Sequence, residues 1–386
     1  MVRAYGTPFR VLQVISSMHI GGAERVVQHL VRSADPNRFG IDVWALQGGG
    51  IVGEELTRQG HAVLGPQTSV GRLARYTSPL WLAKVIKERR YDLVHTHGTS
   101  ALLDVAPLRV AGLSPTVVHT FHFGNYPNVK RRRLLAERLA CRVVDRLVAV
   151  SDSQRQTLLK YLRAPAARTV TIYNGVDDRS DVTEAARQQV RSELGFGSGE
   201  VVAATIAVMT DQKGIPYILE AAALSIGVVD SLRFLIVGGG PLLESLKRQA
   251  SEMGLGGRVL FTGWRPDARR LLAAADLFVS ASLWEGFAMV ILEAMAAGKP
   301  VVATAVGDNA RAVVPGHTGI LVSPADSQAL AAAVLRLATD GESRRELGAA
   351  GLRKYRAEFG VERMVRQYEL LYERAIAGRG TSGDRR

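Results

Sequence analysis

Hydrophobic positions along the chain form short β-branched runs that alternate with longer stretches whose apolar residues recur at helical spacing. The short runs predict buried strands and the longer stretches predict amphipathic helices. Their alternation favours parallel sheets built from strand–helix–strand units. The predicted strands are residues 9–15, 41–46, 92–95, 116–121 and 146–150 in the first half, and 201–208, 232–237, 259–262, 276–280 and 300–304 in the second.

The helical pattern is clearest in four stretches, residues 241–253, 265–275, 289–297 and 361–377. The last of these follows Gly360 and carries Met364, Tyr368, Leu371 and Tyr372 at helical spacing, which predicts a stripe packed against another element.

The chain is too long for one ordinary hydrophobic core, because it has 386 residues. The polar segment 177–199, which ends in "GFGSGE", separates the two strand series and is interpreted as a linker. We therefore predict an α/β protein with two doubly wound, Rossmann-like domains, residues 1–180 and 190–360. Two such sheets facing one another would leave a cleft at the carboxyl ends of their strands, where ligands bind in this class.

The charge balance points to an anionic partner. Lys and Arg number 49 against 36 Asp and Glu, a net charge of +13. Nucleic acid, an anionic membrane and a phosphorylated substrate all fit that charge, and so does an arginine-rich solvated surface. No nucleic-acid-binding module is recognisable, so we expect no nucleic acid. Cys141 is the single cysteine, which excludes a disulfide framework, and the N-terminal apolar run is too short to span a membrane. Both features favour a cytoplasmic protein.

The sequence "LWEGFAMVILEAMAAGKPVVAT", residues 283–304, contains a short helix with a defined end. Gly298 can take the left-handed conformation that terminates a helix, and Pro300 cannot continue it. At the other end, the amides of Met289 and Val290 have no partner within the helix and lie at the positive end of its dipole. They form a candidate anion site.

Two glutamates accompany that site. Glu285 precedes the helix, and Glu293 lies within it with a side chain that leans toward the N-terminus. Two carboxylates beside an anion site suit a ligand rich in hydroxyl groups, such as a ribose joined to a sugar. The alternative is a capping glutamate and an ordinary surface glutamate.

Glycines interrupt two strand-to-helix turns. Gly21 and Gly22 follow the first predicted strand, and "VGGGP" follows the strand 232–237. Neither turn has the GxGxxG pattern, so a dinucleotide fold is poorly supported. The glycines can admit a phosphate or a sugar close to the backbone, or they can serve only to turn the chain.

Four histidines fall in "HTHG" and "HTFHFG". On a strand, His95 and His97 share one face and could ligate a metal, but no carboxylate partner is apparent, so we expect no metal site. His122 follows a strand end, where functional groups of parallel sheets collect. His119, with one of His95 and His97, is interpreted as a packed or hydrogen-bonded structural residue.

A cationic cluster at residues 130–133 precedes leucines and alanines at helical spacing. Leu134, Leu135, Leu139 and Val143 could share a side of this helix, flanked by Arg131, Arg138 and Arg142. Such a helix can bind an anionic membrane surface. The alternative, which we favour for the helix itself, packs the leucine side on the sheet. In either case the cluster predicts weak, salt-sensitive binding to anionic lipid.

Together these motifs resemble the retaining glycosyltransferases of family four, which have the GT-B fold. The resemblance rests on "GGAERVV", "YNGVD", "QKG", "VGGGP", "FTGWRPD" and "EGFAMVILEAMAAGKPVVAT", in the order of that family, and spans residues 11–326. It implies two Rossmann-like domains facing across a cleft, and a last helix that crosses back to the N-terminal domain. It also implies transfer of a sugar from a nucleoside-diphosphate sugar to an acceptor hydroxyl, with no metal and no cofactor.

The resemblance assigns roles where the motifs match. Glu293 resembles the glutamate that binds the ribose, and Glu285 the one that orients donor-sugar hydroxyls, helped by amides near Phe287 and Ala288. Met289 and Val290 would offer amides to the diphosphate, with Gly22 approaching it and Gly21 beside it. The remaining implied roles are Lys213 neutralising the leaving diphosphate, His122 at the reacting sugar, and Arg265 in the loop bordering the base.

One position departs from the family pattern. Many members have an arginine about five residues before the lysine, where this chain has Val208. Arg311 or Arg265 could substitute, or turnover could be slow. Ala288, where glycine is frequent, is a smaller departure. A catalytically weak sugar-nucleotide-binding protein and a GT-B-like sugar-nucleotide epimerase are therefore alternatives. The acceptor is not identified by the sequence. A lipid-linked or phosphorylated acceptor on the inner membrane face agrees with the basic cluster.

Overall fold

The computed structural model describes residues 7–19, 21–65, 74–122, 126, 128–178 and 183–380. The chain folds as two compact units of similar size. Unit 1 comprises Met1–Gly175 and Val361–Arg386, and unit 2 comprises Val176–Gly360. The chain thus completes unit 2 before its last helix returns to unit 1.

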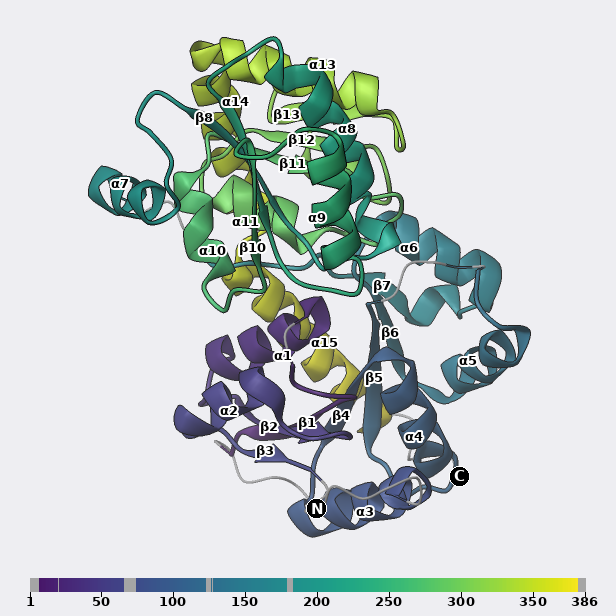
Figure 1. Ribbon diagram of the computed structural model, residues 1–386. Helices are drawn as coiled ribbons and strands as arrows, with labels where there is room; N and C mark the ends of the chain where they lie inside the picture. The colour runs from purple at the N-terminus through teal and green to yellow at the C-terminus, as the bar shows by residue number, and fades with distance from the viewer. Residues whose placement is uncertain are drawn as a thin grey trace. The chain divides into compact units, whose positions relative to one another are not determined.

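Unit 1 is built on a seven-stranded parallel sheet in the order β3-β2-β1-β4-β5-β6-β7 (Figure 1). Strands are added in one direction from β1 to β3 and in the other from β4 to β7, so the sheet has a switch point between β1 and β4. The sequence pattern predicted five of the seven strands and missed β3 and β7, which are only two and three residues long. The strands are β1 Phe9–Ile15, β2 Phe39–Ala45, β3 Val63–Leu64, β4 Leu93–His97, β5 Thr116–Phe121, β6 Arg146–Ala149 and β7 Thr169–Thr171.

Helices cover both faces of this sheet, as expected for a doubly wound fold. One core contains side chains of α3 (Ala74–Arg89), α4 (Gly98–Val110) and α5 (Arg131–Val143), together with the π-helix Leu158–Leu162. On the other face, α1 (Gly22–Ser33) and α2 (Gly50–Arg58) pack over β1 and β2. The short helix α6 (Asp152–Thr157) and the 3-10 turn Ala166–Arg168 complete this part of the unit.

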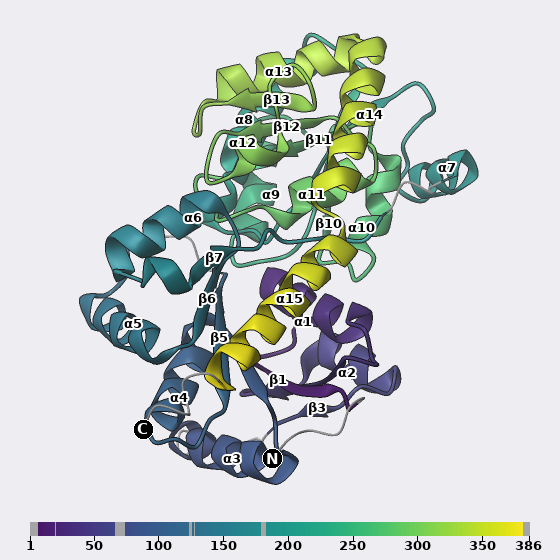
Figure 2. The same cartoon turned by 180° about the vertical axis from the view of Figure 1, so that it is seen from behind.

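The last helix, α15 (Val361–Gly380), packs on the β5 side of unit 1 and beside α1 (Figure 2). Its predicted stripe is buried: Met364, Tyr368, Leu371 and Tyr372 are at most 7% exposed. Glu369 accepts a hydrogen bond from the Asp35 amide at 2.8 Å. The return of this helix to the first unit agrees with the fold that the motifs imply.

Unit 2 is built on a six-stranded parallel sheet in the order β10-β9-β8-β11-β12-β13. Its switch point lies between β8 and β11, which pair directly. Five of the six strands were predicted, and the four-residue β13 was missed. The strands are β8 Val201–Ile206, β9 Leu232–Val237, β10 Val259–Gly263, β11 Leu277–Ser280, β12 Val301–Thr304 and β13 Gly319–Val322.

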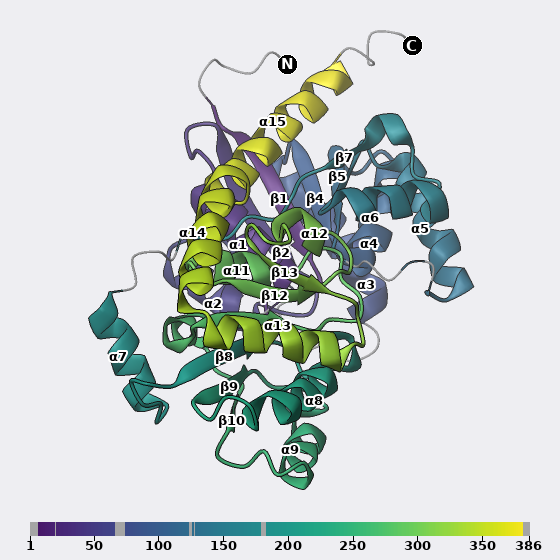
Figure 3. The same ribbon diagram turned by 90° about the horizontal axis from the view of Figure 1, so that it is seen from above.

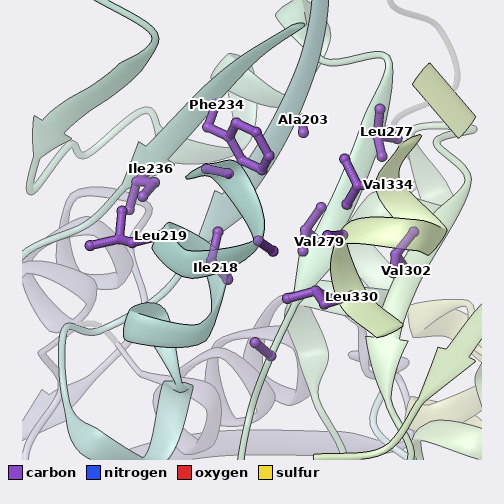
Figure 4. Packing of buried hydrophobic residues seen from close by; sticks show 14 of the residues in the cluster. Ala203, Ile218, Leu219, Phe234, Ile236, Leu277, Val279, Val302, Leu330 and Val334 are labelled. Carbon is purple, nitrogen blue, oxygen red and sulfur yellow. The ribbon is translucent and has the colours of Figure 1, made fainter. Parts of the chain in front are cut away.

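The main core of unit 2 lies between its sheet and three helices (Figure 4). Ile218, Phe234, Leu277, Val302 and Leu330 pack there, each at most 1% exposed. The helices are α8 (Ile215–Ile226), α9 (Leu243–Glu252) and α13 (Ser327–Thr339), of which α13 runs beside β12 and β13 (Figure 3). A second core includes α7 (Glu184–Glu193), α10 (Ala268–Leu271) and the turn Leu272–Ala274, while α11 (Met289–Ala296) packs on α14 (Gly341–Glu358).

Segment 177–199 differs from the predicted linker. Residues 179–182 lie outside the described part, but 184–193 form α7, a helix of unit 2. Arg187 and Arg191 hold that helix to Asp276 with ion pairs of 2.9 and 3.2 Å. The polar composition misled the prediction, because the helix is held by these two arginines together with the buried Val190.

Candidate active site

The candidate residues of unit 2 follow the two strands that flank its switch point. In doubly wound sheets this is where ligands bind, because the loops after the two strands diverge and leave a crevice. The chain leaving β8 forms the short turn Asp211–Lys213, and the chain leaving β11 carries Glu285. Lys213 and Glu285, 72 residues apart in sequence, therefore meet at one edge of the sheet.

Glu285 is held by three donors. Lys213 Nζ lies 2.5 Å from Glu285 Oε1, and Ser282 Oγ donates to the same oxygen at 2.9 Å. Gln212 Nε2 lies 3.4 Å from the second oxygen, Oε2. The lysine side chain is 22% exposed and the glutamate side chain 8%. The pair is thus partly screened from water, and the lysine side chain is the more exposed of the two.

Glycines let the loops around this pair approach closely. Gly214 follows Lys213 with φ +59°, and a Cβ there would lie 2.1 Å from the carbonyl oxygen of Ala281. Gly307, with φ +53°, would place a Cβ 2.5 Å from the carbonyl oxygen of Glu285. A side chain on Gly214 would push apart the two loops that hold the pair, and one on Gly307 would push the loop after β12 away from Glu285.

Helix α11 begins next to Glu285 and ends as the sequence predicted. Gly298 has φ +66°, the left-handed conformation expected after a helix. Ala288 is the N-cap and provides no side-chain acceptor. The amides of Met289 and Val290, the first two helical positions, therefore have no acceptor within the helix. Phe287 is 6% exposed and its ring centroid lies 5.4 Å from that of Phe359, which fixes the approach to the helix.

Glu293 forms an ion pair that the sequence analysis missed. Arg269 Nη2 lies 2.5 Å from Glu293 Oε1, and Arg269 Nη1 lies 3.6 Å from Asp177 Oδ2. The side chains of Arg269 and Glu293 are 18% and 11% exposed. Arg269 follows "FTGWRPD" by two residues, and no sequence signal distinguishes it from its neighbour Arg270.

Arg265 and Arg311 were considered as substitutes for the arginine that is missing at Val208. Both already form ion pairs with carboxylates. Arg265 bonds to Asp267 at 2.8 Å and to Glu193 at 2.9 Å. Arg311 pairs with Glu358 at 2.6 Å. Each would have to leave these partners to reach a phosphate. Val208 itself is 57% exposed.

In unit 1, the glycine pair lies at the start of α1. Gly21 is the N-cap, with φ −171°, and Gly22 is the first helical residue. A Cβ on Gly21 would lie 2.3 Å from Glu24 Oε2, so the carboxylate folds back over the N-cap. Burial raises the pKa of Glu24 above its ordinary value. Glu24 lies within the motif "GGAERVV", but its contact with Gly21 was not predicted.

The other candidate of unit 1, His122, follows β5 and lies against His97 at the end of β4. Their rings are stacked with centroids 5.2 Å apart, and His97 Nδ1 lies 2.9 Å from His122 Nε2. Burial lowers the pKa of His122 to about 4 and that of His97 well below its ordinary value. Both imidazoles are therefore neutral near pH 7.

His95 and His119 are hydrogen-bonded structural residues, as predicted. His95 shares a sheet face with His97 and contacts the hydroxyls of Tyr372 and Thr120 at 2.7 and 2.8 Å. His119 Nδ1 lies 2.8 Å from Thr96 Oγ1 on the other face. Within the described part of the chain, no group of three or more His, Cys, Asp and Glu side chains is arranged to hold a metal ion.

The prediction that the leucines of α5 pack together on the sheet is wrong. Leu134 and Val143 are half-buried against the core, whereas Leu135 and Leu139 are 57% and 54% exposed. The four side chains point to different sides because packing selects positions that spacing alone did not separate. Across the described residues, no helix is long and apolar enough to cross a membrane.

Sequence profiles of two families match this chain. Glycosyl transferases group 1 matches residues 186–354, and Glycosyltransferase Family 4 matches residues 20–180. The UDP-Gal:alpha-D-GlcNAc-diphosphoundecaprenol alpha-1,3-galactosyltransferase of Escherichia coli is 30% identical over 67% of this chain and 69% of its own. A D-inositol 3-phosphate glycosyltransferase of Geodermatophilus obscurus is 33% identical over 78% of this chain and 71% of its own.

Solved structures with the same fold include glycosyltransferases. Anabaena HepE in complex with UDP matches with a TM-score of 0.82 and 25% identity, over 95% of this chain and 100% of that one. WaaG, a glycosyltransferase involved in lipopolysaccharide biosynthesis, matches with a TM-score of 0.73 and 17% identity, over 94% and 99% of the two chains. The second likeness concerns the fold alone.

Proposed function

The chain belongs to glycosyltransferase family 4 and has the GT-B fold, and from that premise we propose that it is a retaining, metal-independent enzyme. It is a glycosyltransferase that uses a nucleotide sugar. The observation that carries the proposal is the pair of Lys213 and Glu285 at the switch point of unit 2, close in sequence to the open amides of Met289 and Val290. A cation, a helix N-terminus and a carboxylate suit a diphosphate joined to a sugar.

Departure of the diphosphate sets the main barrier, because negative charge develops on the leaving oxygen. Lys213 and the amides of Met289 and Val290 would stabilise that charge by electrostatic interaction. Glu293 would bind the ribose hydroxyls, and Glu285 would orient the hydroxyls of the transferred sugar. Phe287, Ala288 and Arg265 are further donor-binding candidates in unit 2. In unit 1, Gly21 and Gly22 are donor-binding candidates because glycine lets a ligand approach the backbone closely.

Retention is proposed to follow from attack on the face that the diphosphate leaves. The bond from C1 of the sugar to the phosphate oxygen breaks and the bond to the acceptor oxygen forms, while the acceptor proton passes to the leaving phosphate. No protein nucleophile is then required, which agrees with Glu285 being held by Lys213 and Ser282. The α-1,3 linkage named for the Escherichia coli relative supports an α-linked product.

The test is turnover with a panel of sugar nucleotides. We expect the purified protein to transfer a labelled sugar from one UDP- or GDP-sugar to an acceptor in a cell extract, with equal rates in EDTA. Mass spectrometry identifies the product, and NMR of its anomeric proton gives the configuration. Loss of activity in EDTA would refute metal independence, and an inverted product would refute retention.

A catalytically weak nucleotide-sugar-binding protein is the second candidate. It is favoured by exposed Val208, where many relatives have an arginine, and by the ion pairs that engage Arg265 and Arg311. Tight binding of UDP or GDP without product from any donor would support this candidate. Exchange between two sugar nucleotides without an acceptor would instead indicate an epimerase.

We further propose that the acceptor is anionic and reached at a membrane surface. Residues 130–168 contain eleven Lys and Arg against three Asp and Glu, a net charge of +8 within the +13 of the chain. The exposed members form what we call the basic face, which also includes the exposed Leu135 and Leu139. Its cations are Lys130, Arg131, Arg132, Arg142, Lys160, Arg163 and Arg168.

The basic face combines charge with apolar contact. Arg138 donates to the carbonyl oxygen of Tyr161 at 2.7 and 2.9 Å, and Arg168 donates to that of Arg142 at 3.1 Å, so its segments are held together. Each cation near an anionic surface contributes about 1 kcal/mol. The names of the relatives include a diphosphoundecaprenol and an inositol phosphate, and both support an anionic acceptor.

Vesicle flotation tests the membrane proposal. We expect the wild type to float with phosphatidylglycerol vesicles at low salt and not at high salt. Changing Lys130, Arg131 and Arg132 to serine should abolish flotation. Changing Arg58, Lys84 and Lys87, three exposed cations of unit 1 outside the basic face, removes equal charge and should preserve it. Equal loss in both variants would show attraction to net charge alone, and no flotation at low salt would favour a soluble acceptor.

A further inference from the structure

A continuous chain of hydrogen bonds leads from His122 into the interior of unit 1. His122 Nε2 lies 2.9 Å from His97 Nδ1, and His97 Nε2 lies 2.8 Å from Gln13 Oε1. Gln13 Nε2 donates to the Tyr372 hydroxyl at 3.1 Å, and that hydroxyl lies 2.7 Å from His95 Nδ1. A residue of the C-terminal helix is thereby linked to the candidate histidine at the end of β5.

Because these groups are buried, the hydrogen-bond chain restricts which nitrogen or oxygen atoms carry the protons. Gln13, His97 and Tyr372 are at most 1% exposed, so water does not replace a missing partner. Burial also keeps His97 and His122 neutral, since it lowers the pKa of each. A neutral imidazole has one N–H group and one lone pair. Every contact needs one donor and one acceptor, so the direction of one contact fixes the next.

Contact lengths indicate that direction. The 2.7 Å separation of the Tyr372 hydroxyl and His95 Nδ1 is typical of a hydroxyl donor, and the 3.1 Å contact with Gln13 is typical of an N–H donor. The Tyr372 oxygen then accepts from Gln13 Nε2, which turns the amide oxygen of Gln13 toward His97. His97 Nε2 donates to that oxygen, so His97 Nδ1 carries the lone pair and accepts from His122 Nε2.

We propose that Gln13 and Tyr372 are positioning residues that set the tautomer of His122 through His97. His122 then carries its hydrogen on Nε2 and presents Nδ1 as an acceptor. Among the described residues, none bonds to that nitrogen. The ligand it suits is a hydroxyl group of the acceptor or of the donor sugar, and this identification rests on the proposed function. The hydroxyl donates to Nδ1 and is oriented without any change in the charge of the imidazole.

Three substitutions probe the chain. Gln13→Met removes both amide groups at similar volume, and Tyr372→Phe removes the hydroxyl that orients the amide. Gln13→Glu keeps an oxygen that accepts from His97 Nε2, so it should restore the tautomer. The matched control is Tyr368→Phe, a buried phenol on the same helix that bonds to Thr120 and lies outside the segment between Gln13 and His122.

The readout is the long-range ¹H–¹⁵N correlation spectrum of histidine ring nitrogens, recorded near pH 7.5 and assigned with His122→Asn. We expect a protonated Nε2 and an unprotonated Nδ1 for His122 in the wild type, in Gln13→Glu and in Tyr368→Phe. Gln13→Met and Tyr372→Phe should give a mixture of tautomers. The same two variants should lose roughly three- to tenfold in kcat, with an unchanged KM for the sugar nucleotide.

Two results would overturn the inference. One is a protonated Nδ1 on His122 in the wild type, and the other is an unchanged tautomer in a folded Gln13→Met protein. The spectra require no turnover, so they separate this inference from the proposed function. The expected tautomer in a protein that transfers no sugar would refute the function alone. Sugar transfer by a protein with Nδ1 protonated would refute only the inference about the tautomer.

Discussion

The carboxyl ends of the central strands carry different chemistry in the two units, with charged groups in unit 2 and neutral groups in unit 1. In unit 2, the contacts after β8 and β11 are between charged groups, Lys213 with Glu285, and Glu293 of α11 pairs with Arg269. In unit 1, the contacts at the ends of β4 and β5 are between neutral imidazoles, with amide and hydroxyl groups behind them.

This difference shows that the fold provides the location and the side chains decide the ligand. Partly buried cations and open helix amides favour a charged diphosphate, because they offer donors to an anion at little desolvation cost. A buried neutral network favours hydroxyl groups, because it offers a lone pair without a charge.

The largest expected effect concerns the dependence of unit 1 on α15. Deleting residues 361–386 removes Met364, Tyr368 and Tyr372 from its interior, each worth about 1.5–3 kcal/mol of burial. We expect unit 1 to unfold while unit 2 remains folded, and activity to be lost. Hydrogen exchange followed by mass spectrometry should show full exchange in peptides of unit 1 and protection in those of unit 2.

A substitution at an exposed position of α15 serves as the control for this deletion. Leu370 is 43% exposed, so Leu370→Ala should change the unfolding free energy by no more than about 0.5 kcal/mol. Protection of unit 1 that survives the deletion would show that its sheet is stable without α15.

Replacing Lys213 should remove most of the enzymatic activity. Lys213→Ala removes the cation proposed to bind the diphosphate, and a charged hydrogen bond of that kind is worth about 1.5–3 kcal/mol, or roughly 10- to 150-fold in kcat/KM. Steady-state rates with the preferred sugar nucleotide measure it. Lys247, exposed and paired with the exposed Glu244, is the control, and Lys247→Ala should leave the rate unchanged. Near-full turnover by Lys213→Ala would place the diphosphate elsewhere.

Substitution of Glu293 should affect nucleotide binding, whereas substitution of Glu285 should affect turnover. Glu293→Gln should weaken UDP binding about tenfold, because the proposed ribose contact loses its charge and Arg269 loses its nearer carboxylate. Glu285→Gln should instead reduce mainly kcat, since the role proposed for Glu285 is to orient the transferred sugar. Calorimetry with UDP and GDP decides between them. Equal affinity of the Glu293→Gln variant and the wild type would contradict the ribose assignment.

The smallest expected effect concerns the stability of unit 1 at acidic pH. This effect is selective for unit 1 and vanishes near neutral pH. His119 and His122 of unit 1 have pKa values lowered by burial to about 3 and about 4, from an ordinary 6.5. As pH falls below 6.5 the unfolded chain binds protons that folded unit 1 does not, so the stability of unit 1 decreases toward pH 4. Above pH 7 these groups contribute no pH dependence.

Unit 2 provides the internal comparison, because its single histidine, His317, is exposed. Hydrogen exchange at pH 7.5 and 5.0 should therefore show loss of protection in unit 1 first. Simultaneous loss in both units between these values would contradict the role of the buried histidines.

Ten strands were predictable from the sequence because each contains a run of β-branched or apolar residues. The strands β3 and β7 were missed because they have only two and three residues, and β13 was missed although β6, β11 and β12 have the same four-residue length. Helix α7 was missed because its composition is mostly polar: Arg187 and Arg191 pair with Asp276, and Val190 supplies its apolar contact with the core.

Local sequence determined the parts of the site that depend on neighbouring residues. The end of α11 at Gly298, its open amides and the two-glutamate spacing are set within 22 residues, so the chain alone specifies them. The helical spacing of apolar residues in α15 likewise predicts its buried stripe. Partners distant in sequence were decided only by the tertiary structure, as with Arg269 on Glu293 and Tyr372 bonded to Gln13. Such contacts form where elements far apart along the chain pack together, and spacing along the chain does not encode which side chains meet there.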